Sequence, residues 1–220
     1  MALPDGKALE LIEKAEKIVV AANPERGIDG LAAALALANL LAEREKTVEL
    51  VYPGSVPPSL QEPSGSVAIR KSPRGCCLVI SFRHGELPVE KVSYKTDAKT
   101  FNLILHPAPF NFNPSQLTFK TVAPEIDLLV ALGFGKAGSL SDLCAKFGWR
   151  LPDLTVLNIN DDPDTELFGQ ANIIEAASSL SHLLFKKFSV WGEVPSPTVA
   201  RVLLEGLTAW DSVPDAVSRL

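Results

Sequence analysis

The stretch LNINDDPDTELFGQANIIEAASSL, from Leu157 to Leu180, decides the fold class of this chain. Its first residues belong to the apolar segment Leu154–Ile159, which is typical of a strand buried in a sheet. Three aspartates and Pro163 follow, and we predict a turn there because Asp and Pro both favour turns. The small and hydroxyl residues near the end of the stretch mark the start of a helix that we predict over Ala176–Phe188. A strand that leads through a polar turn into a helix is typical of an α/β fold.

The same alternation of strands and helices recurs on both sides of this stretch. Apolar and β-branched runs predict further buried strands at Lys17–Ala22, Thr47–Tyr52 and Ile126–Leu132. Helical spacing and runs of small apolar residues predict helices over Pro4–Glu16, Asp29–Arg44, Ser139–Phe147 and Pro197–Trp210. Because parallel strands are joined by helical crossovers, we predict a three-layer α/β domain with a mostly parallel sheet and helices on both faces.

A β-rich segment between about Val79 and Val122 interrupts this order, and we interpret it as an insertion. The segment Pro53–Pro73 before it predicts a loop, with a candidate strand only at Val67–Ile69. We predict strands at Cys77–Phe82, Val89–Lys95, Thr100–Leu105 and Gln116–Val122, of which the middle two form a hairpin. The chain is therefore expected to be a single α/β domain over residues 1–220 with an inserted β-hairpin region.

Composition narrows the classes of function. Of the 220 residues, 46% are hydrophobic, which is enough for a sizeable core. The net charge of −5 arises from acidic residues spread along the chain, so the sequence has no basic stripe that would bind a long nucleic acid. Small phosphorylated ligands stay compatible with this charge, because the N-termini of helices can bind them.

The sequence also indicates a compartment. No apolar run approaches the roughly 18–20 residues of a membrane helix, and the N-terminus lacks the basic-then-apolar order of a signal peptide. Cys76, Cys77 and Cys144 fit neither a disulfide framework nor the spacing of zinc ligands. We therefore expect a cytoplasmic protein with reduced thiols and no membrane partner.

Four separated segments resemble, in the same order, the first domain of the DHH-type phosphoesterases. The closest branch is that of the oligoribonucleases and phosphoadenosine-phosphate phosphatases. The segments are Ile18–Leu37, Asp127–Leu140, Leu157–Leu180 and Leu203–Ser212. The third keeps the family's strand, its proline and its two short motifs, Leu167-Phe168-Gly169 and Ala177-Ser178-Ser179. Its Asn160-Asp161-Asp162 stands where the family has Asp-His-His.

The resemblance implies that the family's two-metal centre is degenerate here. A family histidine falls near Asn23, two aspartates fall on Gly27 and Asp29, and the aspartate that bridges the metals falls on Gly133. Glycine has no side chain to coordinate a metal, and two neighbouring cations need several anionic or imidazole ligands to offset their repulsion. At most one Mg²⁺ or Mn²⁺ site is implied, with the ligands Asp29, Asp161 and Asp162. A further family aspartate falls on Trp210 or Asp211.

The candidate ligand-binding residues should gather at the carboxyl ends of the strands, where open α/β sheets bind their ligands. They are Asn23, Asp29, Gly133, Asn160, Asp161, Asp162 and Ser178. Each also has a structural interpretation. The acidic turn is more typical of a solvated loop, Asp29 fits a helix N-cap, and Ser178 and Ser179 fit a helix start. The separated His84, His106 and His182 are typical of structural histidines, and Gly133–Gly138 lacks the P-loop pattern.

The leading hypothesis is a pseudoenzyme, a degenerate DHH-like domain that binds a nucleotide or a protein partner without a cofactor. One alternative is a single-metal phosphodiesterase or phosphatase acting on short oligonucleotides or small nucleotides. Another is an assembly subunit, compatible with a homo-oligomer, whose interface includes the inserted hairpin and Phe110 and Phe112 of the bend Pro107–Pro114. The chain ends at Leu220, just past the helix that closes the family's first domain, so the family's C-terminal substrate domain is expected to be absent.

Overall fold

The computed structural model describes residues 4–61, 65–75, 77–83, 89–107, 115 and 117–211. The chain divides into a larger unit, Met1–Gly75 with Ala123–Leu220, and a smaller unit, Cys76–Val122. The smaller unit coincides closely with the segment predicted as an insertion.

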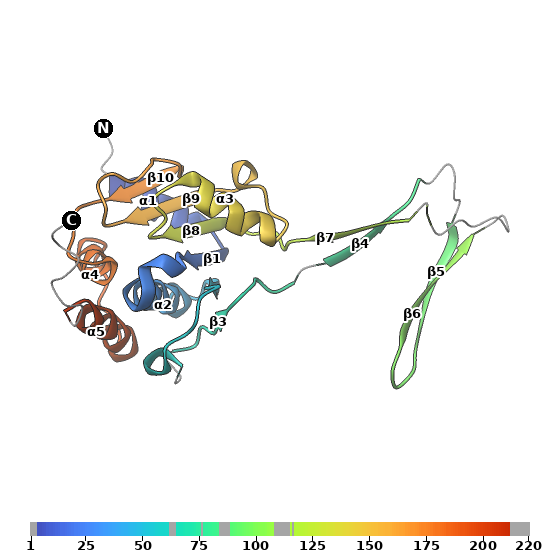
Figure 1. The fold of residues 1–220 in the computed structure, drawn as a ribbon, viewed down its shortest axis with the longest axis horizontal. Helices are drawn as coiled ribbons and strands as arrows, with labels where there is room; N and C mark the ends of the chain where they lie inside the picture. Colours follow the sequence, from blue (N-terminus) through green and yellow to red (C-terminus); the bar gives the residue numbers. More distant parts are fainter. Residues whose placement is uncertain are drawn as a thin grey trace. The chain divides into compact units, whose positions relative to one another are not determined.

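A parallel sheet forms the centre of the larger unit (Figure 1). Within the described residues it has six strands in the spatial order β10-β9-β8-β1-β2-β3, and their pairings are parallel. The strands are β1 (Lys17–Ala22), β2 (Thr47–Val51), β3 (Ile69–Arg70), β8 (Leu128–Leu132), β9 (Val156–Asn160) and β10 (Ala171–Ile174). The predicted parallel sheet is confirmed, and β1 has the predicted bounds.

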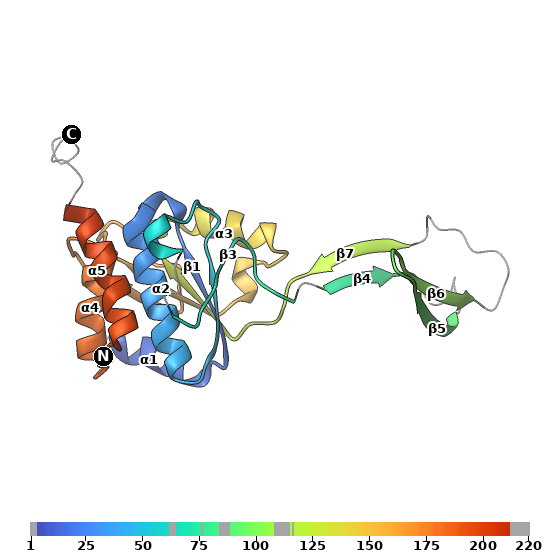
Figure 2. The same cartoon turned by 90° about the horizontal axis from the view of Figure 1, so that it is seen from below.

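Helices cover both faces of this sheet, which gives the three predicted layers (Figure 2). Alternate residues of one strand enter different cores: Val20 packs with the helices of one face, and Val19 packs with those of the other. The first face carries α1 (Pro4–Lys14), α2 (Gly27–Glu43), α4 (Leu180–Val190) and α5 (Pro197–Asp211), and the second carries α3 (Ala137–Lys146). The short 3₁₀ turns are η1 (Pro24–Arg26), η2 (Pro58–Leu60) and η4 (Leu151–Asp153).

Helix α2 is buried along nearly its whole length, as its small apolar sequence predicts. The sheet covers one side, and α4 and α5 contact the others. Gly206 allows α5 to approach α2 and α4 closely, because a Cβ atom at this position would lie 3.0 Å from Ala32 Cβ and 2.0 Å from Ser181 Oγ. The buried α2 fixes the turn before it, which carries several of the candidate site residues.

The structure differs from the prediction at two elements near the site. The strand β10 was not predicted, because four residues with an Asn in the second position carry too little apolar pattern to indicate a strand. Helix α4 begins at Leu180 rather than at Ala176. Its N-cap is Ser179, whose hydroxyl accepts a hydrogen bond from His182 N at 3.2 Å. The predicted capping role therefore belongs to Ser179 and not to Ser178.

The smaller unit contains the predicted antiparallel strands. In its described residues, β4 (Cys77–Ser81) pairs with β7 (Thr118–Val122), and β5 (Val89–Thr96) pairs with β6 (Phe101–Pro107). The predicted hairpin is confirmed, but its turn spans residues 97–100 rather than the predicted Thr96–Lys99, because Thr96 pairs with Phe101. Asp97 closes its turn by accepting hydrogen bonds from the backbone of Lys99 and Thr100. Phe110 and Phe112, His84 and Cys76 lie outside the described residues.

No described helix is both long and apolar enough to span a bilayer.

Candidate functional site

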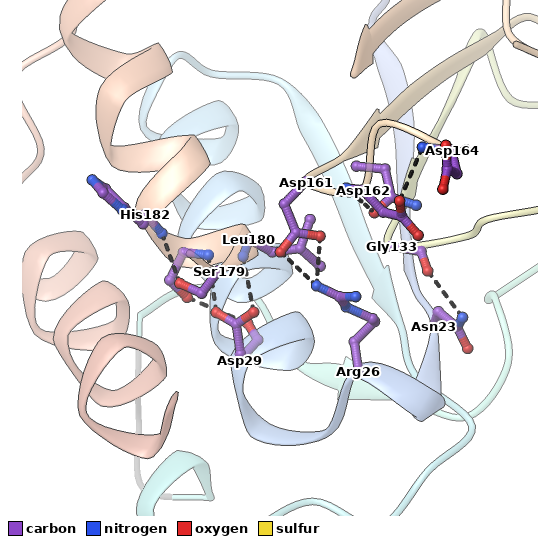
Figure 3. Close-up of polar contacts among 12 residues, drawn as sticks. Asn23, Arg26, Asp29, Gly133, Asp161, Asp162, Asp164, Ser179, Leu180 and His182 are labelled. Atoms are coloured by element: carbon purple, nitrogen blue, oxygen red, sulfur yellow. Dashed lines mark hydrogen bonds and ion pairs between the residues drawn. The ribbon is translucent and has the colours of Figure 1, made fainter. Parts of the chain in front are cut away.

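Three neighbouring strands deliver the candidate residues to one edge of the sheet. β9, β8 and β1 are adjacent, and their carboxyl ends lead into Asp161, Gly133 and the turn that begins at Asn23. The segments are joined by hydrogen bonds, from Asn23 N to Leu132 O and from Gly133 N to Ile159 O, both at 3.0 Å. The predicted convergence of these segments at the carboxyl ends of the strands is therefore observed (Figure 3).

An ion pair between Arg26 and Asp161 occupies the middle of this site. Arg26 Nη2 lies 2.5 Å from both carboxylate oxygens of Asp161, whose side chain is buried. Burial raises the pKa of Asp161, and the nearby Asp29 carboxylate raises it further, while the Arg26 guanidinium lowers it; burial is the largest influence. Figure 3 shows the guanidinium directed at Asp161. A cation that belongs to the chain thus compensates this buried carboxylate.

Sequence reasoning did not select Arg26. It lies in the turn that the resemblance aligns with an acidic metal-binding motif, between Asn23 and Asp29. A basic residue inside such a motif is the signal that was available, because a guanidinium would repel a divalent cation bound next to it. Its partner Asp161 lies 135 residues away, so the pair itself could not be found without the fold.

Gly133 and Arg26 fit together sterically. Gly133 has φ +72°, a conformation that favours glycine, and a Cβ atom there would lie 2.6 Å from Arg26 Cγ and 2.9 Å from Leu180 Cδ1. The Arg26 side chain therefore passes over a position that must lack a side chain. An aspartate at 133, as the family has in order to bridge its metals, is incompatible with this placement of Arg26.

We expect Gly133→Ala to lower the free energy of unfolding by about 2–5 kcal/mol, because positive φ costs about 1–2 kcal/mol and overpacking about 1–3 kcal/mol. Gly135→Ala is the matched control, since no atom lies within 4 Å of a Cβ built there. That variant should lie within about 0.5 kcal/mol of the wild type. Urea unfolding followed by circular dichroism measures both. Equal stability of the two variants would contradict the described packing of Arg26 on Gly133.

Asp29 binds the N-terminus of helix α4. Its two carboxylate oxygens accept hydrogen bonds from Leu180 N and Ser181 N, each at 2.9 Å, and the side chain is buried. These N–H groups have no partner within α4, and the carboxylate also interacts favourably with the helix dipole. Asp29 lies in the first turn of α2, whose N-cap is Arg26. The alternative in which Asp29 caps its own helix is therefore wrong, because its side chain caps a different one.

A second helix N-terminus at the site also receives a carboxylate. Ala137 N, at the start of α3, donates a hydrogen bond to Glu166 Oε2 at 2.9 Å, and Glu166 N donates to Gly135 O at 3.0 Å. Glu166 follows the acidic turn, so this turn is linked to the glycine-rich segment at the start of α3. Carboxylates of the chain thus occupy the N-termini of α3 and α4, a kind of position that can otherwise bind a phosphate, whereas the N-terminus of α2 has no side-chain cap.

The remaining candidates make local hydrogen bonds. Asn23 donates from Nδ2 to Gly133 O at 2.9 Å and accepts at Oδ1 from Glu25 N at 3.1 Å. Asn160 Oδ1 accepts from Asp162 N at 3.3 Å. Asp162 is exposed and accepts at Oδ1 from Asp164 N at 2.9 Å, as in a solvated acidic turn. The exposed Ser178 has its Oγ 2.6 Å from His182 Nδ1.

These residues do not fit a metal centre in the arrangement observed. Asp29 is bound to backbone N–H groups and Asp161 to a guanidinium, so neither carboxylate presents its oxygens to an ion. In the part of the chain that the structure describes, no group of three or more His, Cys, Asp and Glu side chains is placed to hold a metal. The position of a further ligand, Trp210 or Asp211, falls at the end of α5, where the side chains lie outside the described part.

Comparison with known proteins supports the fold. No family profile and no curated protein sequence matches the chain. The structure is similar to the crystal structure of an exopolyphosphatase-related protein from Bacteroides fragilis, with a TM-score of 0.58 and 16% sequence identity. The similarity covers 94% of this chain and 49% of that protein, so this chain spans about half of its length.

This similarity concerns the fold alone. It agrees with the α/β fold that the sequence resemblance implied, and it does not distinguish one branch of that family from another. A function for this chain must therefore be argued from the geometry of the site.

Proposed function

We propose that this chain is a phosphoesterase-like domain that has an internal ion pair and hydrogen bonds in place of a metal centre and that serves as a non-catalytic binding subunit for a protein partner. The Arg26–Asp161 pair, at the edge where three strands converge, carries this proposal. The guanidinium compensates a buried carboxylate that would otherwise require another cation.

A guanidinium does not supply the chemistry of a metal. Metal-dependent hydrolysis needs a cation that coordinates a water molecule and lowers its pKa to about 7. Arginine carries its charge on N–H donors and cannot ligate water as a Lewis acid. Next to Arg26 lie Gly133, which has no side chain, and Asp161, whose carboxylate is bound to the guanidinium and is not free to act as a base. The described residues of the site can therefore form a stable charged surface, but they include no group that would activate a water molecule as a nucleophile.

A protein partner is favoured over a nucleotide. A nucleotide phosphate would bind best at a helix N-terminus, where the backbone N–H groups and the dipole attract an anion. The N-terminus of α3 is paired with Glu166 and that of α4 with Asp29, so a phosphate would have to displace a carboxylate from either. That displacement would leave a buried aspartate without partners at α4, which is costly. The N-terminus of α2 has no side-chain cap, but a phosphate there would meet the carboxylate of Asp29 in the first turn of that helix.

Calorimetric titration with Mn²⁺ and Mg²⁺, followed by a dinucleotide hydrolysis assay, tests this proposal. We expect no saturable binding with a dissociation constant below about 1 mM and no turnover. In Arg26→Ala, which frees Asp161, Mn²⁺ affinity should rise at least about tenfold because a competing cation has been removed. Arg44→Ala is the control, since Arg44 pairs with Glu193 outside the site.

The alternative single-metal phosphodiesterase predicts the opposite pattern. Of the three implied metal ligands Asp29, Asp161 and Asp162, only Asp162 is exposed, and it would be the accessible ligand. Stoichiometric metal binding by the wild type, with turnover that Asp162→Ala abolishes, would contradict the proposed loss of catalysis. Equal Mn²⁺ affinity of the wild type and Arg26→Ala would contradict the role given to Arg26.

A further inference from the structure

The hairpin of β5 and β6 has one apolar face. Its register pairs Val92 with Leu105, Tyr94 with Leu103 and Thr96 with Phe101, and side chains of cross-strand pairs lie on the same face of a sheet. We call these six residues the hairpin face. Tyr94 is 72% exposed, Phe101 67% and Leu103 46%. The face is therefore apolar and open within the described structure.

The opposite side of the hairpin is polar. The alternating positions carry Lys91, Ser93 and Lys95 on β5 and Asn102, Ile104 and His106 on β6. Ser93 Oγ lies 2.9 Å from His106 Nε2 across this side. Alternation of this kind is typical of a sheet with one side in water and the other packed against a core. A two-stranded hairpin is at best marginally stable alone, so burial of the hairpin face would stabilise it.

We propose that the hairpin face is the interface of a symmetric dimer, in which it packs against the same face of a second copy of this chain. This proposal is independent of the function proposed for the strand-edge site, because none of its residues belongs to that site.

The distribution of charge favours a second copy as the partner. Val, Tyr, Thr, Phe, Leu and Leu make up the face, and none of these side chains is charged at neutral pH. Two copies can therefore face each other without burying a charge, which a symmetric contact requires because each patch meets itself. A single-stranded nucleic acid needs cations beside the aromatic rings that stack its bases. The lysines lie on the opposite side of the hairpin, so the face does not meet that need.

The aromatic pair gives the face a preformed anchor. The rings of Tyr94 and Phe101 stack with their centroids 5.7 Å apart and an interplanar angle of 16°. Because the rings already hold each other, their association with a partner loses little side-chain entropy. Buried aromatic residues near the centre of an interface commonly carry most of its binding energy.

The surface area that two hairpin faces could bury is typical of a weak dimer. A buried aromatic side chain contributes about 150–250 Å², so the two exposed rings offer on the order of 250 Å² per copy. With the aliphatic residues of the face, two copies would bury about 900–1,000 Å², near the lower bound of about 1,000 Å² for specific interfaces. We therefore expect a dissociation constant of about 1–100 µM.

Sedimentation equilibrium of the complete chain tests the dimer. At about 200 µM the wild type should sediment mainly as two chains of 23.6 kDa each. Leu103→Glu places a charge at the centre of the face and should weaken association at least about 100-fold. Ile104→Glu is the matched control, because Ile104 is the neighbouring residue, is also exposed and points to the opposite side. That variant should dimerise like the wild type.

A mixing experiment identifies the face itself. Leu103→Glu and Leu103→Lys should each be monomeric, and an equimolar mixture should regain at least about tenfold in affinity over either alone, since the two charges then attract. Unchanged thermal unfolding of the variants would show that the larger unit is still folded. A wild type that is monomeric at about 200 µM, or equal dissociation of Leu103→Glu and Ile104→Glu, would overturn the proposal.

Discussion

Replacement of Asp29 by alanine is expected to lower the free energy of unfolding by about 3–4 kcal/mol, because the loss of one partner leaves buried donors unsatisfied at about 1–3 kcal/mol each. The carboxylate is buried and accepts from two backbone N–H groups at the start of α4. Alanine would leave these groups without an acceptor and without the charge that favours the helix dipole. Urea unfolding at pH 7, monitored by circular dichroism, measures the difference.

Asp127→Ala is the matched control for this prediction. Asp127 also accepts from two backbone N–H groups, those of Glu16 at 3.0 Å and Lys17 at 2.7 Å, but it is exposed. Water can replace the lost acceptor there, so the loss of stability should be clearly smaller. Asp29→Asn should be intermediate, since an amide keeps one acceptor and loses the charge. Equal losses for Asp29→Ala and Asp127→Ala would show that burial of the α4 N-terminus is not the cause.

Local sequence patterns were sufficient for the central strands and the long helices. The apolar run at β1 has no plausible conformation other than a buried strand, and the small apolar residues of α2 required cover on several sides. The strand β10 could not be predicted in this way. Its four residues are held in the sheet by parallel pairing with β9, which is a tertiary property.

The position of the site was predictable, whereas its chemistry was not. Residues that follow adjacent parallel strands must meet at one edge, so the convergence of Gly133 and Asp161 follows from topology. The partners of these residues depend on contacts between distant parts of the chain. Asp29 meets a helix about 150 residues later, and Arg26 meets Asp161 across 135 residues. The resemblance aligned Gly133 with the family's bridging aspartate. The structure shows why a glycine fits at this position, because the side chain of Arg26 passes over it.

Arg26→Met is expected to lower the free energy of unfolding by about 3 kcal/mol at pH 7, at the lower end of the range for breaking a buried pair because Arg26 is only partly buried. The substitution leaves the buried Asp161 without its cation. Asp161→Asn in the same background removes the uncompensated charge. The double variant should therefore recover about 1–2 kcal/mol relative to Arg26→Met, which gives a measurable coupling between the two sites.

The pH dependence of Arg26→Met separates charge from packing. Burial already raises the pKa of Asp161, and loss of the guanidinium removes the main influence that lowers it, so the pKa should rise further. A carboxyl group whose folded-state pKa lies above its unfolded value costs stability at neutral pH, and this cost falls as the pH falls through the folded-state pKa toward the unfolded value of about 3.8. The deficit of Arg26→Met relative to the wild type should therefore shrink as the pH is lowered from 7, while that of the double variant should not. A deficit that is constant with pH would mean that Arg26 stabilises the site through packing on Gly133 rather than by standing in for a metal ion.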